Sequence, residues 1–122
     1  MMVLVDTSVW IDHLRNREPL LVKLLQSNSV FGHPFVRGEL ALGNLPQRQM
    51  ILGLLDNLPQ APVVFADEIN PFIETQALFG LGIGFIDAHL LGSAQLAINA
   101  QLWTRDKRLL AVASRLNLAM VE

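Results

Sequence analysis

The N-terminal stretch Met2–Asp12 constrains the fold more than any other part of the chain. It begins with a continuous apolar run that ends abruptly at Asp6, and two hydroxyl residues follow. From Trp10 onward the apolar residues recur at helical spacing, which is typical of a buried strand that leads directly into a helix. The acid therefore stands at the carboxyl end of a strand, where open α/β sheets bind their ligands.

Short apolar runs alternate with segments of helical periodicity along the rest of the chain. Further strands are expected at Ser29–Phe31, Val63–Phe65, Leu102–Thr104 and Leu118–Val121. This alternation predicts one α/β domain over residues 1–122, with a central, mainly parallel sheet of four to five strands flanked by helices.

The helix boundaries follow from caps, prolines and glycines. We expect Thr7 or Ser8 to cap the first helix, Pro19 to lie in the first turn of the second and Gly43 to end the third. The next helix begins near Pro46, and its buried face is expected to consist of Met50, Ile51, Leu54, Leu55 and Leu58. The remaining helices are expected from Asp67 or Asn70, from Ile86 to Ala97 and from Asp106 to Leu116. The glycine-rich stretch Gly80–Gly84 is interpreted as a mobile loop.

Composition excludes several classes of protein. The chain has 52% hydrophobic residues, which argues against disorder, and no cysteine, which excludes disulfides and thiolate metal sites. The formal net charge is -2, so any contact with nucleic acid must come from a local patch. Neither a membrane span nor a signal peptide is evident, and we expect a cytoplasmic protein.

Two acids, Asp6 and Asp106, follow expected strands. Both should therefore lie at the carboxyl edge of the same parallel sheet. The structural alternative for each is a cap on the helix that follows.

Two further acids lie on apolar helical stripes. Glu39 is flanked by apolar residues, and a carboxylate there is costly unless it is paired or metal-bound. Its structural alternatives are an ion pair with Arg37 or a side chain that reaches solvent from the edge of the core. Asp87 has apolar neighbours at helical spacing, and its alternative is a favourable position at a helix N-terminus.

Convergence of the four acids would require a cation, because two carboxylates about 4 Å apart repel by roughly 4 kcal/mol at an effective dielectric near 20. Oxygen donors without cysteine or paired histidines suit Mg²⁺ or Mn²⁺ rather than Zn²⁺. Such a site serves phosphoryl chemistry. Thr7, Ser8 and Thr104 are placed to orient the carboxylates or a water, with helix capping as an equal alternative.

The basic residues Arg105, Lys107 and Arg108 crowd around Asp106. With Arg115 two helical turns further on, they form either a phosphate-contacting patch or a solvated helix face. Asp12 and Arg15 are interpreted as an exposed helical pair.

The chain resembles the PIN-domain family, and within it the VapC toxins of bacterial toxin–antitoxin modules. The resemblance is carried by Val5–Ile11, Gly38–Leu40, Ile86–Leu91 and Leu102–Arg108. It implies a PIN-like three-layer fold and a Mg²⁺- or Mn²⁺-dependent endoribonuclease that cuts structured RNA of translation, such as transfer or ribosomal RNA. The implied metal-binding and catalytic acids are Asp6, Glu39, Asp87 and Asp106, with Ser8 and Thr104 at the family's hydroxyl positions.

The same resemblance implies a homodimer and a VapB-like antitoxin that covers the active-site groove. Two other hypotheses remain open at this point. One is a metal-dependent phosphatase, although Thr7-Ser8 after Asp6 departs from the Asp-x-Asp pair of the commonest such enzymes. The other is a non-catalytic module that only binds RNA or the antitoxin.

Overall fold

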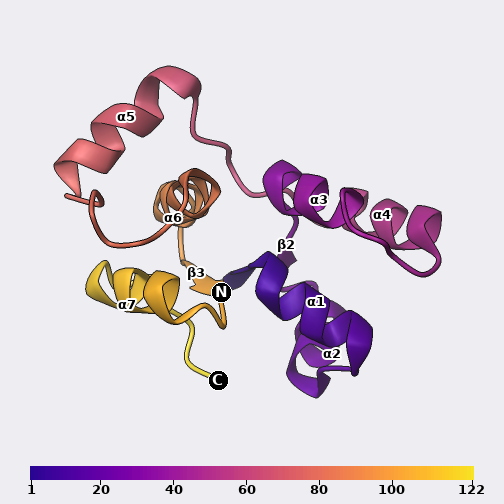
Figure 1. The fold of residues 1–122 in the computed structure, drawn as a ribbon. Coiled ribbons are helices and arrows are strands. Elements are labelled where there is room, and N and C mark those ends of the chain that lie inside the picture. The colour runs from indigo at the N-terminus through magenta and orange to yellow at the C-terminus, as the bar shows by residue number, and fades with distance from the viewer.

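Three short parallel strands form the centre of the molecule (Figure 1). In the computed structural model, which describes residues 1–122, β1 spans Met2–Val5, β2 spans Val30–Phe31 and β3 spans Ala100–Trp103. The strand order is β2-β1-β3, so β1 is hydrogen-bonded on both sides. Three of its four residues are buried, which explains why it is continuously apolar rather than alternating.

The register between β1 and β3 determines which residues meet at the carboxyl edge. Val5 pairs with Trp103, and the Asp6 N–H donates to the Trp103 carbonyl at 2.9 Å. The residues that follow the two strands, Asp6 and Thr104, therefore become neighbours although 98 positions separate them.

Seven helices flank the sheet. They are α1 (Thr7–Arg15), α2 (Pro19–Gln26), α3 (Pro34–Ala41), α4 (Arg48–Asp56), α5 (Ala66–Thr75), α6 (Phe85–Leu96) and α7 (Lys107–Arg115). Figure 1 shows α5, α6 and α7 on the β3 side of the molecule and α1 to α4 on the β2 side. None of the helices has the length and apolar character that crossing a membrane requires.

The core is one cluster of 25 buried apolar residues drawn from the strands and most of the helices. Helix α6 is its most buried helix, with every residue from Ala88 to Ala94 inaccessible to solvent. A helix that is apolar on all sides is expected to be enclosed by its neighbours. Its first turn carries Asp87 and is therefore held in place by the core.

The expected sheet of four to five strands is wrong, because Leu118–Val121 makes only one bridge and Val63–Phe65 makes none. Leu118–Val121 meets β3 through the single bridge between Leu102 and Ala119. The segment before Val63–Phe65 meets β2 through Gly32 and Gln60, and Pro62 then offers no N–H to continue the pairing. Val63–Phe65 itself belongs to no strand.

Two local expectations about helices also need correction. The first helix has Asp6 at its N-cap position, rather than Thr7 or Ser8. In α4 the buried residues are Leu52 and Leu55, whereas Met50 and Leu54 of the expected buried face are more than half exposed. This helix packs mainly on α3, so less of its surface is covered than its apolar composition suggested.

Candidate active site

Asp6 is the only acid of the chain that is buried, with 6% of its surface exposed. It occupies the N-cap position of α1, yet its carboxylate accepts no backbone N–H from that helix. Instead one oxygen, Oδ2, accepts two hydroxyl hydrogen bonds, from Ser8 at 2.7 Å and from Thr104 at 2.8 Å. The structural alternative of a helix cap therefore accounts for the position of Asp6 but not for the orientation of its side chain.

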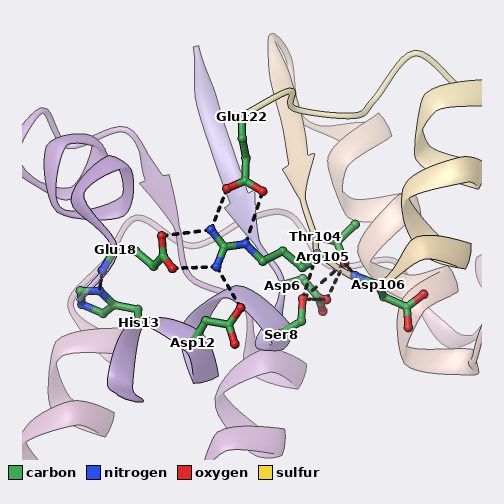
Figure 2. Close-up of polar contacts among 9 residues, drawn as sticks. All are labelled: Asp6, Ser8, Asp12, His13, Glu18, Thr104, Arg105, Asp106 and Glu122. Carbon is green, nitrogen blue, oxygen red and sulfur yellow. Dashed lines mark hydrogen bonds and ion pairs between the residues drawn. The ribbon is translucent and has the colours of Figure 1, made fainter. Parts of the chain in front are cut away.

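The two hydroxyl residues are themselves fixed by the loop between β3 and α7. The Arg105 N–H donates to Ser8 Oγ at 3.1 Å, and the Asp106 N–H donates to Thr104 Oγ1 at 3.1 Å (Figure 2). The loop backbone thus orients both donors toward Asp6, which holds that buried carboxylate in one rotamer.

Asp106 and Asp87 each use one oxygen at a helix N-terminus. Asp106 caps α7 by accepting the Leu109 N–H at Oδ1, at 2.9 Å. Asp87 accepts the Gly84 N–H at Oδ2, at 3.0 Å. The structural alternatives considered for these acids are therefore realised, but each occupies only one of the two carboxylate oxygens.

Glu39 does not pair with Arg37, which forms its ion pair with Asp56 instead. The Glu39 side chain is exposed and accepts the hydroxyl of Thr7 at Oε1, at 2.7 Å. This hydrogen bond directs α3's acid toward the first turn of α1, immediately after Asp6.

Asp87 is affected by the charges of the other three site acids. Burial raises the pKa of the Asp87 carboxyl above its ordinary range; the Gly84 N–H opposes this, and the negative charges of the other three site acids raise it further. These three are Asp6, Asp106 and Glu39. The structure thus places the other three sequence-predicted acids close enough to Asp87 for their charges to act on it.

Each of the four carboxylates has one oxygen that is hydrogen-bonded within the protein and one that is not. Oxygen donors without sulfur or imidazole match the preferences of Mg²⁺ and Mn²⁺. No three acidic or histidine side chains already lie in positions to ligate one ion. The donor chemistry therefore fits such a cation, and the exposed Glu39 and Asp106 are the side chains with most freedom to adjust.

Arg105 has a role that the sequence did not reveal. Its guanidinium donates to Asp12 at 2.8 Å, to both oxygens of Glu18 and to both oxygens of Glu122 (Figure 2). All five N–H groups are therefore engaged, and these carboxylates raise the pKa of Arg105 above its ordinary value. Asp12 thus pairs with Arg105 rather than forming a local pair with Arg15.

This arginine cluster ties the loop that carries Thr104 and Asp106 to α1 and to the α1–α2 connection. The only indication of this role in the sequence is that Arg105 lies between Thr104 and Asp106. Because its donors are all used within the chain, Arg105 is poorly suited to the RNA contact expected of it. Lys107 and Arg108, expected in the same role, form no ion pair and are exposed.

Comparison with known proteins gives two matches over nearly the full length. The chain is 50% identical over 121 residues to the protein named Ribonuclease VapC32 in each of two strains of Mycobacterium tuberculosis. The aligned region covers 99% of this chain and 98% of each relative. No protein-family model matches the chain.

Proposed function

Since this chain belongs to the VapC family of ribonuclease toxins, we propose that it is a metal-dependent endoribonuclease that cleaves structured RNA of translation, either transfer or ribosomal RNA. The observation that carries this proposal is the group of four carboxylates, each with one oxygen oriented by the protein and the other free. The 50% identity to Ribonuclease VapC32 supports the same reaction class.

The free oxygens of Asp6, Asp87, Asp106 and Glu39 would hold Mg²⁺ or Mn²⁺. When bound, such an ion supplies an activated water and stabilises charge on the phosphate. The protein's own contribution is to fix the buried donor Asp6 before the substrate arrives. Ser8 and Thr104 hold Asp6 in one rotamer, so little reorganisation is needed during the reaction.

In the proposed reaction a water oxygen forms a bond to phosphorus in line with the leaving group. The bond from phosphorus to the 3′ oxygen breaks, and that oxygen takes up a proton. The products are a 3′-hydroxyl and a 5′-phosphate. The protein would act in the cytoplasm as a homodimer and would be silenced by a VapB-like antitoxin, in keeping with its family membership.

The experiment that tests this function is incubation of total cellular RNA with the purified chain, freed of any partner, in Mg²⁺, Mn²⁺ or EDTA. The wild-type chain should give discrete fragments with 5′-phosphate ends in either metal and none in EDTA. Asp6→Asn should leave the RNA intact. Asp67→Asn removes an exposed acid of α5 and should cut like the wild type. RNA that stays intact with the wild-type chain in every condition refutes the proposal.

A further inference from the structure

A basic groove lies along α7, the helix that Asp106 caps. This α7 groove is lined by Leu81, Lys107, Arg108, Ala111, Val112 and Arg115, and its volume is about 370 Å³. Three of its six lining residues are cationic and none is acidic.

The cations of the α7 groove are not neutralised by the protein. The ion pairs of the structure involve Arg37 and Arg105, which leaves Lys107, Arg108 and Arg115 without a carboxylate partner. In a chain with a net charge of -2 and nine Lys and Arg residues, this is a local concentration of unpaired positive charge. Anionic groups are expected to accumulate at such a surface.

The spacing of the three cations places them along one face of α7. Arg108 and Arg115 are two helical turns apart, and Lys107 and Arg115 are separated by about 12 Å along the axis at 1.5 Å per residue. The groove is therefore long enough to contact more than one phosphate of a nucleic acid strand. Arg115 is further fixed by donating to the Gln76 carbonyl at 2.6 Å.

The Arg108 side chain packs against the loop Gly80–Gly84. A Cβ atom on Gly82 would lie 2.8 Å from Arg108 Cδ and 2.9 Å from Nη1, so the arginine side chain lies directly on this glycine. The loop continues to Gly84, which donates to Asp87, while Asp106 caps the start of α7. The groove thus connects at both of these points to elements that carry site acids.

From these observations we propose that the α7 groove binds the phosphate backbone of the RNA substrate next to the cleaved bond. This inference rests on the proposed nuclease function, and it states where the substrate strand lies on the protein. The acids and the groove have complementary tasks, because one group attracts a cation and the other attracts the phosphates of the strand. Phosphate contacts of this kind position a strand without reading its sequence.

The test is binding of fluorescently labelled bulk transfer RNA to the full chain in EDTA, followed by polarisation over a range of salt concentrations. Log affinity falls as log salt rises, and each lost phosphate contact should make this negative slope shallower by about 0.7 to 0.9. With 1 M salt as reference, Lys107→Ala or Arg108→Ala should weaken binding about fivefold at 0.15 M salt, and the triple variant with Arg115→Ala about a hundredfold. The matched control Lys23→Ala removes an exposed lysine of α2, across the molecule from α7 (Figure 1), and should bind like the wild type.

A second pair of variants tests the support of Arg108 without removing a charge. Gly80 and Gly82 both have positive φ, of 73° and 79°, so alanine strains the backbone similarly at both positions. Only at Gly82 does the added Cβ meet Arg108, since nothing lies within 4 Å of it at Gly80. Gly82→Ala should therefore weaken binding, but less than Arg108→Ala, because the displaced side chain keeps its charge; Gly80→Ala should leave binding unchanged.

Unchanged salt slopes in the Lys107, Arg108 and triple variants would overturn the inference. Because binding is measured in EDTA, this outcome is separate from the cleavage assay. If the wild-type chain cuts RNA in Mg²⁺ while these variants show no loss of binding, that result would support the nuclease function and reject only the proposed binding of RNA in the α7 groove.

Discussion

His33 makes the stability of this protein depend on pH in a direction that its hydrogen bonds determine. The side chain is 2% exposed, and its Nδ1 accepts the Phe35 N–H at 3.0 Å, which caps α3. Nε2 therefore carries the proton and donates to Ser93 Oγ at 2.9 Å. A second proton can bind only at Nδ1, where it would break the cap on the helix that carries Glu39.

The size of the effect follows from the pKa values in the two states. Burial lowers the pKa of His33 from its ordinary 6.5 to about 4, and His89 contributes in the same direction. Between these values the unfolded chain binds a proton that the folded chain does not. The stabilisation is therefore complete above pH 6.5 and is lost as the pH falls toward 4. At about 1.4 kcal/mol per pH unit the full loss is about 3 kcal/mol, of which about 2 kcal/mol falls between pH 7 and pH 5.

Urea unfolding of the wild type and of His33→Asn at pH 7 and pH 5 measures this contribution. Asn retains an oxygen that can cap α3 but has no group that titrates in this range. His13 and His89, whose pKa values are also lowered by burial, contribute equally to both proteins and cancel in the comparison. The wild type should lose about 2 kcal/mol more than the variant. An equal loss in the two proteins, or an NMR titration of His33 with a midpoint near 6.5, would refute the reasoning.

Three further predictions concern the site and the core. Thr104→Val removes a hydroxyl donor to the buried site carboxylate and should lower the initial rate of RNA cleavage by about 10- to 100-fold, so wild-type rates would contradict its positioning role. Asp87→Asn removes a charge that burial and three nearby acids disfavour, and it should raise the midpoint of thermal unfolding while abolishing cleavage; a lower midpoint would count against this. Gly92→Ala places a Cβ 2.6 Å from Val64 Cγ2 and should lower the free energy of unfolding by about 1–3 kcal/mol, whereas the control Gly53→Ala meets nothing within 4 Å in α4 and should not destabilise.

The sequence predicted the elements whose signals are local. The apolar run before Asp6 and the one that ends at Trp103 form paired parallel strands, and Pro19 starts α2 as expected. Val63–Phe65 has the same β-branched and aromatic character but no strand to pair with. Phe65 is 70% exposed there and occupies the N-cap position of α5. A strand depends on a partner with free hydrogen-bonding groups, which a single segment cannot indicate.

The four acids could be singled out in the sequence because two of them follow apolar runs and the other two lie among apolar residues at helical spacing. The pairing of the acids with particular hydroxyls, such as Glu39 with Thr7, required the structure. The arginine cluster was missed because its partners, Asp12, Glu18 and Glu122, are spread over the whole chain. Each of them resembles an ordinary surface acid when considered alone.

The central position of β1 has a consequence for the chain during its own synthesis. β1 is made first. Thr104, which directly follows β3, is made 98 residues after Asp6. At a synthesis rate of about 5–20 residues per second, Thr104 is added about 5 to 20 s after Asp6. A nascent chain therefore lacks a complete set of acids until almost all of it has been translated.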